Sequence, residues 1–168
     1  MQSHINNKKI AYISLLISLA LICSYVESII PFNVGIPGIK IGLANIVSVI
    51  AIYLFDPFVG VIVVIVRVLL AGFLFGNLYG IIYSMAGGVS SIVLMILLKK
   101  TERFSVLGVS IAGGVMHNLA QLVVAILVVN QIRMSFYGPV LIVSGVIMGA
   151  IISFLSGQII KRVETYVR

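Results

Sequence analysis

The sequence has little charge: of its 168 residues only 9% are Asp, Glu, Lys or Arg, whereas 61% are hydrophobic. An average soluble domain carries about 25% charged residues, so this chain has too few charges to cover a water-exposed surface. The mean hydropathy of +1.27 excludes a soluble globular enzyme. It also excludes intrinsic disorder, which needs low hydrophobicity. The composition therefore predicts an integral membrane protein whose surroundings are the lipid bilayer.

Acidic residues and cysteine are scarce, and this excludes several kinds of chemistry. Asp56 is the only aspartate, so paired aspartates for magnesium and diphosphate chemistry are missing. No Gly-x-x-x-x-Gly-Lys-Ser/Thr loop is present, so the chain does not hydrolyse ATP itself. Cys23, the single cysteine, cannot form an internal disulfide, and with two histidines it offers no convincing set of metal ligands. We therefore expect no enzymatic activity, no cofactor and no metal.

Basic residues give the chain a formal net charge of +7, and their distribution is informative. No base-reading motif accompanies them, so no nucleic-acid partner is predicted. Short clusters between or beyond the apolar stretches are typical of the cytoplasmic loops of a multi-pass membrane protein. Eight of the eleven basic residues lie in such clusters: Lys8, Lys9, Lys99, Lys100, Arg103, Lys161, Arg162 and Arg168.

Apolar runs predict an all-α, polytopic membrane bundle of six transmembrane helices, forming a single domain over residues 1–168. A helix needs about 20 apolar residues to span the bilayer. The second and third segments are short and meet at Pro57, so they could be separate spans, a kinked pair or one re-entrant unit. Residues 31–42, rich in Gly and Pro, are expected to form an irregular loop. The six segments are roughly 10–29, 41–55, 58–75, 79–98, 106–129 and 138–160.

Six spans place both termini on the same side of the membrane. With that side in the cytoplasm, the eight clustered basic residues lie inside and only Lys40 and Arg133 lie in outer loops. We therefore predict a cell-membrane protein with cytoplasmic termini. The apolar run over residues 10–30 loosely resembles a signal peptide. It is about 20 residues long and lacks an Ala-x-Ala-like cleavage site, so we expect a retained first helix.

Small residues at every fourth position indicate where helices approach closely. Two glycine stripes predict packing within the bundle, one formed by Gly145, Gly149, Ser153 and Gly157 and the other by Gly72, Gly76 and Gly80. Ser14 and Ser18 form a shorter stripe on the first span. That stripe could be a docking surface for a partner or a site of internal packing.

Polar residues at membrane depth are costly, about 2.5–3.5 kcal/mol for a charged side chain near the helix centre, and they indicate a functional site. On the predicted topology almost all of them lie at mid-depth or in the outer half, which predicts a polar cavity open to the outside. The cluster is cationic on balance, with Lys40, Arg67 and Arg133 against Glu27, so an anionic or amphipathic small molecule is favoured. The candidate substrate-binding residues are Glu27, Lys40, Asn45, Arg67, Asn77, His117, Asn118 and Gln121.

Structural alternatives stay open for these residues. Glu27 and Arg67 could simply pair with each other. His117 could be a hydrogen-bonded core histidine, with Asn118 and Gln121 joining helices. Lys40 could extend to lipid headgroups.

Several motifs resemble the Gx transporter family, which is also labelled heptaprenyl diphosphate synthase component I. The similarity covers roughly residues 35–160. It is carried by Lys40-Ile41-Gly42-Leu43-Ala44-Asn45, Arg67-Val68-Leu69-Leu70, Leu74-Phe75-Gly76, Ser84-Met85-Ala86-Gly87-Gly88 and Gly113-Gly114-Val115-Met116-His117-Asn118-Leu119-Ala120-Gln121.

That family is in turn similar to the substrate-binding S components of energy-coupling factor (ECF) importers. The resemblance implies six helices, an outward-facing ligand site, and docking on a coupling subunit with two ATPases. S components commonly carry Ala-x-x-x-Ala on the first helix, where this chain has Ser14-x-x-x-Ser18. The resemblance and the predicted outward-facing cavity together favour one leading hypothesis: an S-component-like subunit that captures a vitamin-like or isoprenoid/quinone-precursor ligand. The alternative is a non-catalytic membrane accessory subunit of heptaprenyl diphosphate synthesis.

Overall fold

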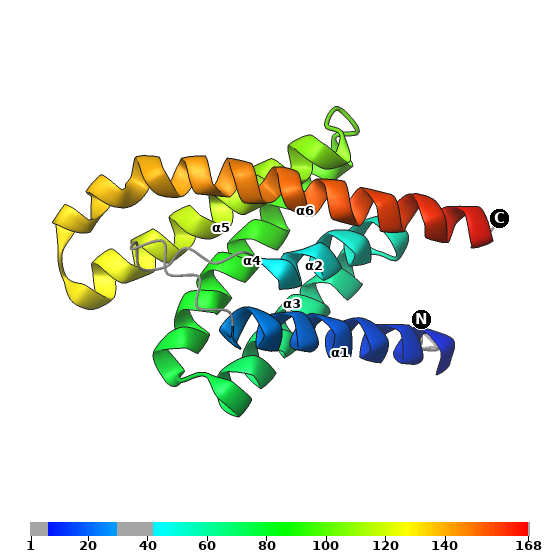
Figure 1. The fold of residues 1–168 in the computed structure, drawn as a ribbon, viewed down its shortest axis with the longest axis horizontal. Coiled ribbons are helices and arrows are strands. Elements are labelled where there is room, and N and C mark those ends of the chain that lie inside the picture. Colours follow the sequence, from blue (N-terminus) through cyan, green and yellow to red (C-terminus); the bar gives the residue numbers. More distant parts are fainter. Residues whose placement is uncertain (1–6, 30–41, 168) are drawn as a thin grey trace, which may run out of the picture.

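The fold was analysed in a computed structural model, which describes residues 7–29 and 42–167. Within these ranges the chain forms six α-helices and one short 3₁₀ helix, η1, and contains no strand, so the predicted all-α bundle is confirmed (Figure 1). The elements are α1 (Asn7–Ile29), α2 (Leu43–Leu54), α3 (Pro57–Phe75), α4 (Leu78–Lys100), α5 (Val106–Val129), η1 (Ile132–Tyr137) and α6 (Gly138–Val167).

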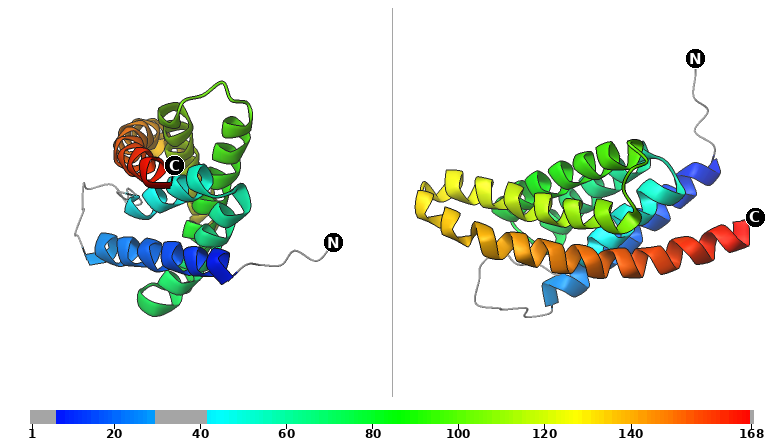
Figure 2. Two further views of the ribbon diagram at one scale, coloured as in Figure 1. Left: turned by 90° about the vertical axis from the view of Figure 1, so that its right-hand side faces the viewer. Right: turned by 90° about the horizontal axis from the view of Figure 1, so that it is seen from above.

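The start of α1 and the end of α6 lie at the same end of the bundle (Figures 1 and 2). The turn between α2 and α3 lies at this end too, because Lys9 Nζ on α1 lies 2.8 Å from Asp56 Oδ2. This ion pair and the backbone hydrogen bond to the amide of Val59 hold the pKa of Asp56 below its usual value. The two ends of the described chain therefore lie at one end of the bundle (Figures 1 and 2).

The second helix is a separate element but a short one. Its 12 residues span about 18 Å at 1.5 Å per residue, well short of the roughly 30 Å of hydrocarbon in a bilayer. The other five α-helices are long and apolar enough to cross. Helix α3 starts immediately afterwards because Asp56 caps it, accepting a hydrogen bond of 3.0 Å from Val59 N, and Pro57 occupies its first position.

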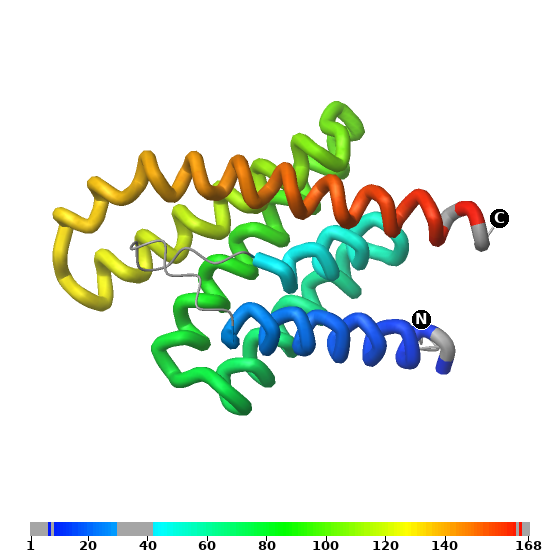
Figure 3. Tube along the Cα trace, in the orientation of Figure 1, coloured from blue at the N-terminus to red at the C-terminus, as the bar shows by residue number. Residues whose placement is uncertain are grey.

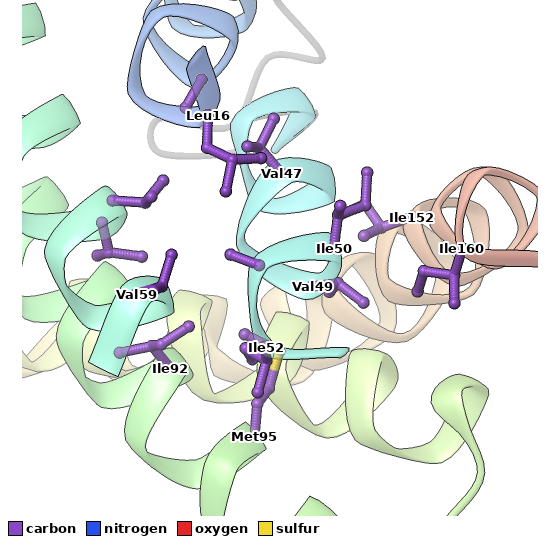
Figure 4. Close-up of a cluster of buried hydrophobic side chains, with 14 of the residues drawn as sticks. Leu16, Val47, Val49, Ile50, Ile52, Val59, Ile92, Met95, Ile152 and Ile160 are labelled. Atoms are coloured by element: carbon purple, nitrogen blue, oxygen red, sulfur yellow. The ribbon is translucent and has the colours of Figure 1, made fainter. Parts of the chain in front are cut away.

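Helix α2 lies at the centre of the core, where it contacts α1, α3 and α6. Most of its side chains are buried, on more than one face of the helix. At its C-terminal end Lys99 Nζ donates a hydrogen bond to the carbonyl of Ile52 and lies over the ring of Tyr53. Figure 4 shows apolar side chains from five helices around this core: Leu16, Val47, Val49, Ile50, Ile52, Val59, Ile92, Met95, Ile152 and Ile160.

Helices α5 and α6 run side by side in backbone contact (Figure 3). A Cβ added to Gly145 would lie 2.7 Å from Val115 Cα, and one added to Gly149 would lie 2.6 Å from Ile111 Cα. Packing by the glycine stripe is thus confirmed at these two positions. The prediction is wrong for Gly157, which has nothing within 4 Å of its added Cβ, because only the first part of α6 faces α5 so closely.

The outward faces of the long helices carry large apolar side chains. Leu15, Phe73 and Phe154 are each about two-thirds or more exposed, at 66%, 77% and 67%. Such residues are stable there when lipid replaces water around them. The multi-pass membrane character predicted from composition fits this surface.

Candidate functional site

A cavity of about 320 Å³ lies between α1, the start of α2, α3, the start of α4 and α5. Since one water takes about 30 Å³ of liquid volume, the cavity has room for about ten waters or one small organic molecule. Five of the eight predicted binding residues line it: Glu27, Asn45, Arg67, Asn77 and His117.

Arg67 is the most informative residue in the cavity wall. It lies in the middle of α3 and is only 8% exposed. Its Nη1 donates to Ser24 Oγ at 3.4 Å and its Nη2 to Asn45 Oδ1 at 3.3 Å, whereas its Nε has no hydrogen-bond partner among the described residues. Both acceptors are neutral and both hydrogen bonds are long. The guanidinium is therefore positioned without direct neutralisation.

Glu27 lines the same cavity from near the C-terminal end of α1. Its Oε1 accepts a hydrogen bond of 2.5 Å from the backbone N–H of Gly42, directly before α2. Glu27 lies close enough to act on Arg67 electrostatically. The two are nevertheless not ion-paired. Among the described residues the structure has one salt bridge, and it joins Lys9 to Asp56. The alternative of a direct Glu27–Arg67 pair is therefore wrong.

The polar cluster on α5 divides between two places. His117 lines the main cavity, but Asn118 and Gln121 line a second one of about 20 Å³. Asn118 Nδ2 donates to the carbonyl of Leu141 on α6 at 2.9 Å, so this residue joins two helices. His117 and Gln121 both pack against Gly87 of α4, where an added Cβ would lie 3.0 Å and 2.9 Å from them. Gly87 thus makes room for both side chains.

Asn77 lines the cavity and also has a structural role. Its Oδ1 accepts a hydrogen bond of 2.8 Å from Gly80 N and caps α4. Gly76 and Gly80 line the cavity beside it. Of the second glycine stripe, Gly72 packs against a neighbouring helix, its added Cβ lying 2.0 Å from Ile81 Cγ1 on α4.

Three predicted residues remain, one for ligand binding and two for docking. Lys40 lies outside the described residues. Ser14 and Ser18 are exposed on α1, and the Ser18 hydroxyl donates to the carbonyl of Ser14 at 2.9 Å. Docking at these two serines stays a prediction.

Sequence reasoning missed the hydroxyls of Ser24, Ser28 and Ser84, which also line the cavity. Ser24 comes three residues before Glu27 and therefore faces the same side of α1. Ser84 follows Gly80 by four residues, so it could have been found by continuing that glycine stripe along α4.

A multi-pass helical bundle with a partly enclosed, partly polar cavity belongs to the class of membrane proteins with a candidate small-molecule site. The family model described as heptaprenyl diphosphate synthase component I matches residues 16–159. The match covers most of the chain, which therefore belongs to this family. Comparisons with curated proteins and with solved structures found no match.

Proposed function

We propose that the protein is a membrane-embedded substrate-binding subunit, like an S component, which captures a small molecule from outside the cell. The observation that carries the proposal is the guanidinium of Arg67, buried at mid-helix in a cavity wall and held only by neutral groups. A charge at that depth is expensive. A ligand with an anionic group offsets the cost by neutralising the charge directly.

The surrounding residues have distinct parts in this proposal. Asn45 and Ser24 orient the guanidinium, and His117 on α5 offers a further polar group in the cavity wall. Asn118 and Gln121 support the site from behind, since they line the neighbouring cavity on the same helix. The ligand is small, because the cavity holds about 320 Å³.

Passage of the ligand into the cell would need partners, since the chain has no phosphate-binding loop of its own. We propose an ECF-type coupling subunit and two ATPases. The exposed Ser14 and Ser18 on α1 offer a surface of small residues for such docking. The basic end of the bundle, which holds both termini, would face the cytoplasm.

Native mass spectrometry of protein purified gently from its own membranes tests this function. We expect a small molecule to be retained by the wild type and lost from Arg67→Gln. Arg133→Gln is the matched control, because Arg133 is an exposed arginine of η1 that does not line the cavity. Circular dichroism establishes that both variants fold. Equal retention by Arg67→Gln and the wild type would show that the site is wrongly assigned.

The family match supports a second function, that of a non-catalytic membrane accessory subunit in heptaprenyl diphosphate synthesis. In this role the cavity would bind an isoprenoid or quinone precursor for a separate enzyme. The same purification distinguishes the two functions through the proteins that accompany the chain. ATPases with a coupling subunit would support import, whereas a soluble prenyl diphosphate synthase without ATPases would support the accessory role.

A further inference from the structure

We infer that the ligand is a small zwitterion, with an anionic group bound at Arg67 and a protonated amine bound at Glu27. The inference rests on the proposed binding function and names the class of molecule that the site selects. It is narrower than the expectation of an anionic or amphipathic molecule, which depended on the excess of Lys40, Arg67 and Arg133 over Glu27 in the sequence.

The charges of the described residues that line the cavity are balanced. Among the described residues that line it, Arg67 carries the permanent positive charge and Glu27 is the carboxylate. Arg133 was part of the cationic excess in the sequence, but it is exposed on η1 and does not line the cavity. A simple anion would therefore meet a carboxylate as well as a guanidinium.

These two charges are kept apart by separate neutral partners. The backbone N–H of Gly42 holds Glu27 Oε1, while Ser24 and Asn45 hold the guanidinium of Arg67. No ion pair joins Glu27 to Arg67 within residues 7–29 and 42–167. Two separated charges in a partly buried cavity are both costly, and a molecule that carries both complementary charges compensates both at once.

The apolar part of the cavity wall indicates what else the ligand carries. Val68, Ala71 and Phe75 on α3 line the cavity together with Arg67. They provide an apolar surface within the same small volume. The favoured ligand is therefore a compact amine–carboxylate or amine–phosphate with an apolar portion.

Three matched probes separate the two charges: L-phenylalanine, 3-phenylpropionate and 2-phenylethylamine share an apolar ring and differ in the charged groups. The full chain is placed in lipid nanodiscs, and its melting temperature is measured with each probe at millimolar concentration. We expect phenylalanine to raise the melting temperature at least twofold more than either singly charged probe. In Glu27→Gln this preference for phenylalanine over 3-phenylpropionate is expected to disappear. Glutamine keeps an oxygen acceptor for Gly42 N, so the variant retains that contact.

Several outcomes would overturn the inference while leaving the binding function intact. One is an equal shift from 3-phenylpropionate and phenylalanine in the wild type, and another is an unchanged preference in Glu27→Gln. If none of the probes binds, the molecule retained in native mass spectrometry decides: a molecule with both an amine and an acidic group supports the inference, and one lacking the amine overturns it. No probe binding together with no retained molecule would overturn the proposed function itself.

Discussion

Replacing Gly145 by alanine tests whether backbone contact between α5 and α6 holds the bundle together. The new Cβ would lie 2.7 Å from Val115 Cα and 2.8 Å from Val115 N. Carbon atoms in favourable contact are about 3.5–4.0 Å apart, so the two helices must separate by most of an ångström. Backbone cannot rotate away as a flexible side chain can, so the strain has no local remedy.

The magnitude follows from two opposing effects. Overpacking of this kind costs about 1–3 kcal/mol. Alanine in a helix recovers about 0.5–1 kcal/mol of that, because glycine loses more backbone entropy on folding. We expect a net loss of about 1–2 kcal/mol, which for a chain of this size lowers the melting temperature by about 2–8 °C.

Thermal unfolding followed by circular dichroism at 222 nm, in one detergent and at one scan rate, measures this loss. Gly157→Ala is the control on the same helix, because its Cβ would meet nothing within 4 Å. That control should leave the melting temperature unchanged or raise it. If Gly145→Ala and Gly157→Ala melted at the same temperature, close backbone packing would not be what limits the stability of the bundle.

Two further predictions concern the α2–α3 turn and the cavity. Asp56→Ala removes both the cap of α3 and the exposed pair with Lys9 and should cost about 1–2 kcal/mol at neutral pH, whereas Asp56→Asn keeps the cap and loses only the pair, worth at most about 1 kcal/mol. Because the folded-state pKa of Asp56 is lowered, the pair's contribution is present above the ordinary pKa of about 3.9 and fades as pH falls through the lowered value. A pH series of melting temperatures should therefore show this acid loss in the wild type and not in Asp56→Asn. Gly80→Ala adds a methyl group beside the cavity, 3.4 Å from Asn77 Oδ1 and near no other atom. It should leave the fold intact and weaken ligand retention about tenfold or more, measured by native mass spectrometry; unchanged retention would place the ligand elsewhere.

The fold was largely predictable because the thickness of a bilayer fixes how long an apolar run must be to span it, and the breaks between such runs are visible in the sequence. The predicted span at 106–129 has the bounds of α5, and the break predicted at Pro57 separates α2 from α3. The extent of α6 was underestimated, since its residues beyond 160 are mostly polar or charged and interrupt the apolar run. Helix geometry continues beyond the apolar run.

The site was harder to predict because it depends on which faces of the helices meet. The sequence brought His117, Asn118 and Gln121 together as one cluster, yet Asn118 is directed to α6 and joins Leu141. Consecutive residues of an α-helix point about 100° apart around its axis, so His117 and Asn118 face different neighbours. The separation of Glu27 from Arg67 likewise depends on Gly42, whose amide draws the carboxylate away.

The shortness of α2 also has a consequence for how the protein is made. With 12 residues this helix is too short to be recognised as a membrane span on its own. Its burial requires α1 and α3, its neighbours in the sequence, and α6, which is synthesised after α1 to α5. The centre of the bundle therefore stays incomplete until the ribosome has delivered α6. Truncation within α6 should then expose α2 to membrane quality control instead of leaving a smaller stable bundle.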